Sequence, residues 1–464
     1  MTTLRINLFS LVVEVYVLLA LLFEFPIPGA SFLHNASLAK LFATVIPLIL
    51  VFVSRFIEGW SPVTLPTALC ALMIPLAAAT GGFLRILLAV LVSLLTIAHF
   101  IALKNFRVKS LLKPTGRFPV GYKLYKEDES QPIYGVFYPA TERTNNRPTF
   151  LPDEFGIKKF FEITLASGKY FPRWLFNIAF HFTTMVKLSA SIDAPLVSSE
   201  ELKEHTSSEK LIPIIFSHGL GACRHNYASL LTQLASKGYF VISMDHKDEV
   251  LKVILDMANV GPEYLEKRVK EARSIIDELS NASGSIGKLF GNKLNLDMSR
   301  LTVMGHSFGG VTAYTTAVED GRIKHCVMID PWLMVFPFEK LDKKLDCSVL
   351  LLESGDWNES FPIGNVTARN MKVMEGQKGN SAGAIYCKIP NSQHNHFIDN
   401  VLLSGGVFKY LNFIADPEVA GETLKTCVKA LDDYFSVIVS KKQESSNFKT
   451  LYEGDKKFPL VIYS

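Results

Sequence analysis

The distribution of hydrophobic positions divides the chain into two parts of different character. Long apolar stretches fill the first hundred residues, at about residues 8–25, 38–53, 63–79 and 83–103. A helix that crosses a bilayer needs ~20 mainly apolar residues. The pattern therefore predicts an N-terminal region of about four transmembrane helices, residues 1–106, with three helices as the alternative.

After about residue 117 short apolar runs alternate with amphipathic segments that have helical spacing, such as residues 264–279. The apolar runs are residues 211–217, 239–244, 301–304, 325–329 and 348–352. Short continuous runs of this kind are typical of strands buried on both faces of a parallel sheet. The alternation predicts an α/β domain over residues 107–440, followed by a tail at 441–464. Residues 284–292 are predicted to form a loop.

The charged residues around the apolar stretches predict an orientation for this membrane region. Lys104, Arg107 and Lys109 begin a basic segment after the fourth stretch, and no acidic residue appears before Glu127. Basic residues next to membrane helices favour the cytoplasmic side. The pattern thus predicts a multi-pass integral membrane protein whose α/β domain lies in the cytosol.

The overall charge and the cysteines exclude two classes of protein. Basic residues number 48 and acidic residues 44, so the net charge is only +4, which argues against a dedicated nucleic-acid binder. The six cysteines are widely spaced and form no CxxC pair or Cys/His cluster. This spacing predicts free thiols rather than a disulfide framework or a structural zinc site. We expect no metal and no cofactor.

Residues 156–188 combine many aromatic residues with scattered basic ones. One interpretation is a helix that packs on the core of the domain. The other is an apolar lid or a surface that lies on lipid, because amphipathic segments of this composition bind membrane interfaces. The composition leaves both interpretations open.

The sequence Gly-His-Ser-Phe-Gly at residues 305–309 is the strongest chemical signal in the chain. It stands between the apolar run 301–304 and a helical segment that begins near Val311. A serine between such elements forms the nucleophile elbow of α/β-hydrolases, where a strained turn lifts the hydroxyl above the sheet. The start of the following helix also favours developing negative charge. Ser307 is therefore the candidate nucleophile, in an α/β-hydrolase fold with a mostly parallel central sheet.

A serine nucleophile needs a histidine base, which follows it in the chain in this fold. Three histidines follow Ser307, and His325 begins an apolar run, which predicts a structural role. His394 and His396 both lie in the loop after the strand-like residues 384–389. The residues alone do not choose between these two.

The base needs an acid that orients it, and the acid stands between the serine and the histidine in this fold. Asp330 and Asp356 each follow a predicted strand, at the edge of the sheet where active sites form. Two backbone N–H groups must also face the developing oxyanion. We expect them from Phe308, directly after the nucleophile, and from Leu220 in the glycine-rich loop 216–221.

Several segments together resemble the platelet-activating factor acetylhydrolase family of phospholipases. Ser-His-Gly-Leu-Gly-Ala at residues 217–222 and Gly-His-Ser-Phe-Gly-Gly at 305–310 are the most specific of them. The others are residues 118–121, 234–239, 245–248, 329–332 and 392–397, in the order of the family. The resemblance covers about residues 115–415.

The resemblance implies calcium-independent hydrolysis of the sn-2 acyl ester of phospholipids that carry a short or oxidised chain. It also implies that Asp330 is the acid and His394 the base, and that His396 stands where the family usually has Asn. Its expected partners are the phospholipid substrate and a membrane. The alternatives are a broader membrane-anchored carboxylesterase or lipase, and an inactive hydrolase domain that serves as a membrane scaffold.

Overall fold

The structure is a computed structural model of the 464-residue chain. It describes residues 109–126, 133–151, 181–206, 208–249, 252–253, 256–281, 284–357, 365–404, 416–440, 445–452 and 459–463, with residues 45, 49, 69, 73, 87, 90, 91, 94, 95 and 162. The chain divides into two compact units. One comprises residues 1–110, 171–186 and 403–407, and the other comprises the remainder. The second unit contains every strand in the described part of the chain.

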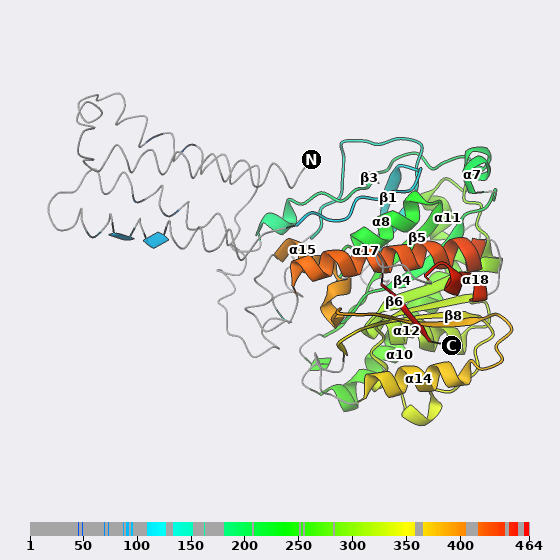
Figure 1. Ribbon diagram of the computed structural model, residues 1–464. Helices are drawn as coiled ribbons and strands as arrows, with labels where there is room; N and C mark the ends of the chain where they lie inside the picture. The colour runs from blue at the N-terminus through cyan, green and yellow to red at the C-terminus, as the bar shows by residue number, and fades with distance from the viewer. Residues whose placement is uncertain are drawn as a thin grey trace, which may run out of the picture. The chain divides into compact units, whose positions relative to one another are not determined.

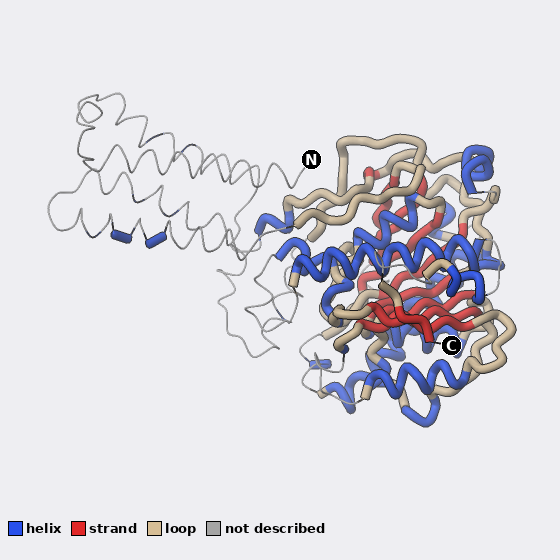
Figure 2. The backbone as a smooth tube through the Cα atoms, in the orientation of Figure 1, coloured by secondary structure: helices blue, strands red, loops and turns tan. Residues whose placement is uncertain are grey.

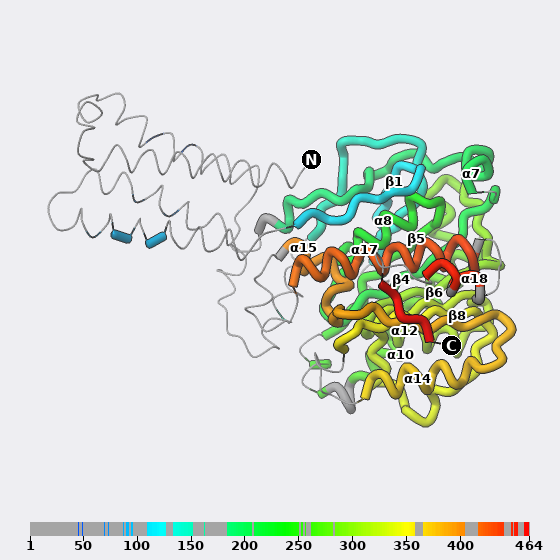
Figure 3. The backbone as a smooth tube through the Cα atoms, viewed as in Figure 1, coloured from blue at the N-terminus to red at the C-terminus, as the bar shows by residue number. Residues whose placement is uncertain are grey.

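A ten-stranded mixed sheet forms the centre of the second unit, in the order β10-β9-β8-β7-β6-β4-β5-β2-β1-β3. The block from β5 through β4, β6, β7 and β8 to β9 is parallel, and β2 and β10 pair with its two ends in antiparallel fashion. The strands are β1 Val120–Tyr125, β2 Ile133–Pro139, β3 Ser191–Ile192, β4 Ile212–Ser217, β5 Tyr239–Asp245, β6 Thr302–His306, β7 His325–Ile329, β8 Ser348–Ser354, β9 Ala384–Ile389 and β10 Val461–Tyr463. Figure 3 shows the C-terminal segment, in red, along one edge of this sheet.

Helices cover both faces of the sheet (Figures 1 and 2). Helices α8 and α17 lie on one face, and α10, α12 and α14 share a core cluster on the other. The helices are α7 Ser199–Thr206, α8 Ala228–Ser236, α10 Met257–Ser280, α11 Ser285–Leu289, α12 Phe308–Glu319, α14 Val366–Gly376, α15 Asp399–Ser404, α17 Pro417–Tyr434 and α18 Ser445–Thr450. The short 3-10 helices are η2 His181–Thr184, η3 Met298–Arg300, η4 Leu333–Val335, η5 Phe338–Lys340 and η6 His394–Phe397, and a π-helix spans Phe435–Ser440.

The five apolar runs predicted as strands are β4 to β8, and every residue of these strands is buried. Burial on both faces explains why the runs are continuously apolar instead of alternating. The helical segment 264–279 lies within α10. The resulting sheet, with helices on both faces, is consistent with the predicted α/β-hydrolase fold. The domain boundaries at residues 106 and 440 stay a prediction.

The prediction of a loop at residues 284–292 was wrong, because α11 occupies Ser285–Leu289. The flanking glycines suggested a loop, but Ile286 is buried in the core cluster. Phe290 directly after the helix packs edge-on against Tyr138 and Phe240. Tertiary burial of these two apolar side chains stabilises a helical turn whose local sequence favours none.

The predicted N-terminal bundle of transmembrane helices, and with it the multi-pass membrane location, needs correction. Among the helices of the described residues, none combines the length and the apolar character that a bilayer span requires. The longest of them, α10, has 24 residues but is amphipathic and carries many charged side chains. The four apolar stretches behind the prediction lie almost entirely outside the described residues, as does most of the aromatic segment 156–188.

Candidate active site

Ser307 lies in a sharp turn between β6 and α12, where it adopts φ 59° and ψ −121°. L-residues avoid such positive φ values, so the surrounding packing must hold the serine in place. A Cβ atom on Gly305 would lie 2.1 Å from the carbonyl oxygen of Gly309, and one on Gly309 would lie 1.9 Å from that of Ser217. Only glycine therefore allows the strand and the helix to approach this closely. The turn has the geometry expected of the predicted nucleophile elbow.

A chain of hydrogen bonds joins Ser307, His394 and Asp330. His394 Nε2 lies 2.8 Å from Ser307 Oγ, and His394 Nδ1 lies 2.9 Å from Asp330 Oδ2. His394 begins η6 in the loop after β9, and Asp330 follows β7. Ser354 at the end of β8 donates its backbone N–H and its hydroxyl to the Asp330 carboxylate, each at 2.7 Å. The structure thus brings together three residues that the sequence separates by up to 87 positions.

The pKa values of His394 and Asp330 are consistent with a neutral histidine base. Burial lowers the pKa of His394 well below its usual range, so the imidazole is unprotonated at neutral pH. Burial also raises the pKa of Asp330 to about 8, while the two hydrogen bonds from Ser354 act in the opposite direction. When Asp330 is ionised, it accepts the Nδ1 proton of His394, which leaves Nε2 free to accept the proton of Ser307.

The structure shows which of the candidate histidines and aspartates belong to the hydrogen-bonded chain of Ser307. The ring nitrogens of His396 lie 3.1 Å and 3.2 Å from the backbone nitrogens of Gln393 and Asp416, and burial lowers its pKa to about 4. His325 Nδ1 lies 2.6 Å from Ser348 Oγ. Asp356 is half-buried, and its backbone N–H donates to the carbonyl of Ser392. The hydrogen-bonded chain to Ser307 therefore contains His394 and Asp330 rather than these residues.

The two predicted oxyanion donors lie on segments that meet at Ser307. A Cβ atom on Gly219 would lie 3.3 Å from Ser307 Cβ, so the loop that carries Leu220 runs directly beside the serine. Phe308 is the first residue of α12, where backbone N–H groups have no partner within the helix. Within the described part of the chain, neither the Leu220 nor the Phe308 N–H group forms a hydrogen bond.

Three residues around His394 were not among the predicted site residues. His306 Nε2 lies 3.1 Å from the carbonyl oxygen of His394, and the two rings stack at 4.6 Å. The hydroxyl of Tyr227 lies 2.8 Å from His306 Nδ1 and accepts the N–H of Gly219. The Trp357 ring lies edge-on to His394, with centroids 3.4 Å apart. The Gly-x-Ser-x-Gly motif accepts any residue at position 306, so the motif did not predict a role for His306.

One group of potential metal ligands occurs among the described residues, His306, Asp330 and His394, whose ligand atoms lie within 4.8 Å of one another. These atoms already serve the hydrogen bonds described above, so the geometry is that of a proton relay. The five cysteines that the structure describes, Cys223, Cys326, Cys347, Cys387 and Cys427, are buried free thiols.

The chain has recognisable relatives. The family model described as platelet-activating factor acetylhydrolase, isoform II, matches residues 104–254 and 277–457. A platelet-activating factor acetylhydrolase of Cavia porcellus is 28% identical over 356 residues, which cover 69% of this chain and 75% of the relative. A probable 1-alkyl-2-acetylglycerophosphocholine esterase of Arthroderma benhamiae is 24% identical over 204 residues, 40% of this chain and 46% of the relative.

A solved structure supports the fold. A ferulic acid esterase from Streptomyces cinnamoneus superposes with a TM-score of 0.53 at 16% identity, over 77% of this chain and 99% of the esterase. At this identity the likeness shows the α/β-hydrolase architecture alone. Together with the family match, it shows that the chain is a serine ester hydrolase and a member of the platelet-activating factor acetylhydrolase, isoform II, family.

Proposed function

We propose that this chain hydrolyses the sn-2 acyl ester of phospholipids that carry a short or oxidised acyl chain, without calcium. The observation that supports it most directly is the hydrogen-bonded chain from Ser307 through His394 to Asp330 in a member of this family. The relatives are named for the removal of an acetyl group, and one is named for a glycerophosphocholine ester. Those names favour a short sn-2 acyl group in this chain as well.

The reaction begins when His394 Nε2 takes the proton of Ser307 as the serine oxygen attacks the ester carbonyl. The Leu220 and Phe308 N–H groups stabilise the oxyanion of the tetrahedral intermediate. His394 then gives the proton to the departing lysophospholipid oxygen, which leaves an acyl-enzyme on Ser307. Water attacks the acyl-enzyme by the same route and releases the free acid.

Asp330 acts through His394. Its carboxylate holds the Nδ1 proton and thereby selects the tautomer whose Nε2 can accept the serine proton. It also stabilises the imidazolium that forms in each step. His306 is a positioning residue, because it binds the carbonyl oxygen of His394 and stacks on its ring.

Acyl-chain selectivity tests the proposed substrate class. We expect kcat/KM for glycerophosphocholines to fall roughly tenfold or more between an sn-2 acetyl and an sn-2 palmitoyl chain, because a site selective for a short acyl group would not accommodate the additional methylene groups. Excess EGTA should leave both rates unchanged. The measurement is release of lysophospholipid from a series of defined substrates. Cleavage of simple aryl esters without cleavage of any phospholipid would instead favour the broader carboxylesterase.

Replacing Asp330 by asparagine tests the acid. We expect kcat to fall about 10⁴-fold, because the amide presents an N–H to His394 and favours the wrong tautomer. The matched control is Asp356→Asn, which should keep its activity within a few-fold. In the wild type, kcat/KM should rise with pH as Asp330 ionises near its raised pKa of about 8.

The stability of Asp330→Asn distinguishes a chemical effect from misfolding. The raised pKa means that the folded state favours the protonated carboxyl, so this group contributes stability below the unfolded pKa and loses it as pH rises through about 8. At pH 9 the asparagine variant should therefore melt no lower than the wild type. An inactive variant that also melts far below the wild type would indicate a structural role instead.

A further inference from the structure

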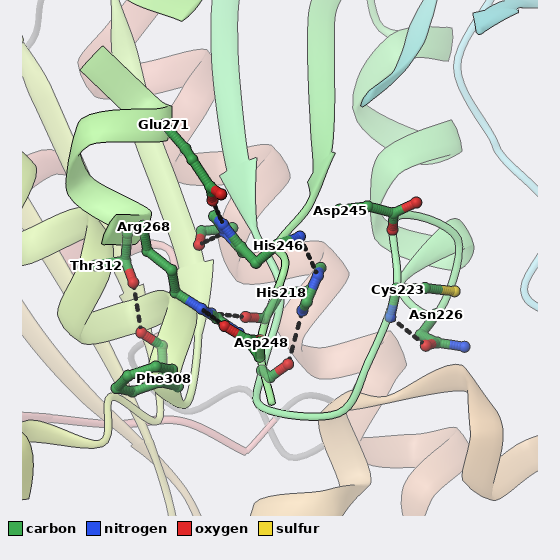
Figure 4. Close-up of polar contacts among 12 residues, drawn as sticks. His218, Cys223, Asn226, Asp245, His246, Asp248, Arg268, Glu271, Phe308 and Thr312 are labelled. Carbon is green, nitrogen blue, oxygen red and sulfur yellow. Dashed lines mark hydrogen bonds and ion pairs between the residues drawn. The ribbon is translucent and has the colours of Figure 1, made fainter. Parts of the chain in front are cut away.

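We propose that the segment at the end of β5, Asp245 to Asp248, together with Arg268 and Glu271 of α10, positions the oxyanion hole. The inference rests on the proposed ester hydrolysis by Ser307, and it assigns a role to residues that take no part in the proton relay. Figure 4 shows these side chains around the loop that leaves β4. We call this group the loop clamp.

Arg268 contacts both segments that carry the oxyanion donors. Its side chain is 1% exposed, its Nη1 donates to the carbonyl oxygen of His218 at 2.6 Å, and its guanidinium lies 4.5 Å above the ring of Phe308. Nε donates to Asp248 Oδ1 at 3.0 Å, and Nη2 pairs with the other oxygen of that carboxylate. Because the guanidinium is rigid and planar, its hydrogen bonds to Asp248 and to the His218 carbonyl fix the directions as well as the distances of these contacts.

The ring of His218 sets the direction of the Leu220 N–H group. The backbone N–H of His246 donates to His218 Nε2 at 3.1 Å, so the ring proton is on Nδ1. Nδ1 then donates to the carbonyl oxygen of Gly219 at 2.7 Å. Because a trans peptide is planar, the N–H of Leu220 points opposite to that carbonyl. The hydrogen bond that orients the Gly219 carbonyl therefore also orients the Leu220 N–H group.

The side chain of His246 fastens the start of the same loop. Its Nε2 lies 2.6 Å from Ser217 Oγ at the end of β4, and its Nδ1 lies 2.5 Å from Glu271 Oε2. Ser217 is next to the elbow, since its carbonyl oxygen is the atom that excludes a Cβ on Gly309. The loop and the nucleophile turn are thereby joined through one histidine.

Asp245, the first residue of the loop clamp, holds the C-terminal end of the loop at Arg224. Asp245 accepts the backbone N–H of Arg224 at 2.7 Å and forms a buried ion pair with its guanidinium. The loop from Ser217 to Arg224 is thus fixed at both ends, and the donor residue Leu220 lies between them. Three of the four residues 245–248 make these contacts or hold Arg268, namely Asp245 at the end of β5 and His246 and Asp248 after it.

Stability alone gives little reason for such an arrangement. Burying two Arg–Asp pairs has a large desolvation cost, and apolar side chains of similar volume often stabilise a core at least as well. Fixed donors in an oxyanion hole, in contrast, lower the barrier because they need no reorganisation during the reaction. The contacts converge on the two peptide groups around Gly219 and on Phe308, which is where that benefit arises.

The first test uses Arg268→Ala with an aryl acetate, so that it does not depend on the phospholipid. We expect kcat to fall about 10²-fold with KM almost unchanged, at the lower end of the loss seen when an oxyanion donor is removed. The loss should be smaller for the matching thionoester, because sulfur gains less from the N–H donors. The control is Arg273→Ala on the same helix, whose exposed side chain pairs with Glu319.

The second test is chemical rescue. A cavity of about 340 Å³ lined by Tyr264, Lys267, Arg268 and Glu271 among others lies at the clamp, so a small cation can reach the space that Arg268 leaves. Millimolar guanidinium should restore kcat of Arg268→Ala at least severalfold, while tetramethylammonium should not. Asp248→Asn should show the same kcat loss if Arg268→Ala does not fold.

Three results would overturn the inference. The first is a kcat of Arg268→Ala or Asp248→Asn, in a folded protein, within threefold of the wild type. The second is equal losses for the ester and the thionoester. The third is a change in KM alone. In each of these the wild type still hydrolyses the aryl acetate, so the proposed ester hydrolysis by Ser307 would stand. A wild type that cleaves no ester would overturn the proposed function first, and the inference with it.

Discussion

Ser307→Ala is expected to lower kcat for ester hydrolysis about 10⁶-fold, the size of loss that follows removal of a serine nucleophile. The substitution removes only Oγ, whose partner is His394 Nε2. Alanine keeps the Cβ that the strained turn already accommodates, so the melting temperature should stay close to that of the wild type. Initial rates with an aryl acetate and labelling by a fluorophosphonate probe measure the effect.

The control for this substitution is Ser280→Ala, at the exposed end of α10, where the hydroxyl donates to the carbonyl of Ile276. This variant should label as the wild type does. Labelling that survives in Ser307→Ala would show that the nucleophile is another residue. A folded wild type that reacts with neither probe nor ester would favour the inactive scaffold.

His394→Gln and His396→Gln form the second decisive comparison, since the two histidines are two positions apart in η6. We expect His394→Gln to lose about 10⁶-fold in kcat, because glutamine cannot accept the serine proton. His396→Gln should stay within a few-fold of the wild type. It should instead lose about 1–2 kcal/mol of unfolding free energy, because His396 binds the backbone of the turn.

Steady-state kinetics and denaturant unfolding of both variants, compared in parallel, separate the two roles. The pair is a matched test because the substitution and the turn are the same and both histidines are buried. A large loss of kcat in His396→Gln with normal stability would contradict the assignment of the base. So would an active His394→Gln variant.

The local sequence was sufficient to predict features that depend on a single strand or turn. The buried strands could be predicted because strands buried on both faces are mainly apolar. The turn at Ser307 could be predicted because only glycine fits at positions 305 and 309. The edge strands β3 and β10, and the strands β1 and β2 between β3 and β5, were not predicted. The π-helix after α17 was not predicted either, because no local signal distinguishes it.

Predictions failed where the meaning of a local sequence pattern depended on tertiary contacts. The glycines around α11 suggested a loop, and the apolar stretches of the first hundred residues suggested spanning helices that the described helices do not provide. The choice between His394 and His396 was likewise open to the residues alone, and only the family resemblance favoured His394. Both histidines follow the same strand, and sequence spacing carries no information about the direction of a side chain.

By itself, the sequence determined the strand–helix alternation, the elbow at Ser307 and, through its resemblance, the family. These depend on residues that are close together in the chain. Apart from the family resemblance, only the tertiary structure distinguishes which carboxylate and which imidazole approach Ser307, since Asp330 and His394 follow different strands. It also decided that the segment at the end of β5 contacts the loop after β4. Adjacent parallel strands end at the same edge of a sheet, and this brings Asp245 and Asp248 to a loop that precedes them by some twenty residues or more.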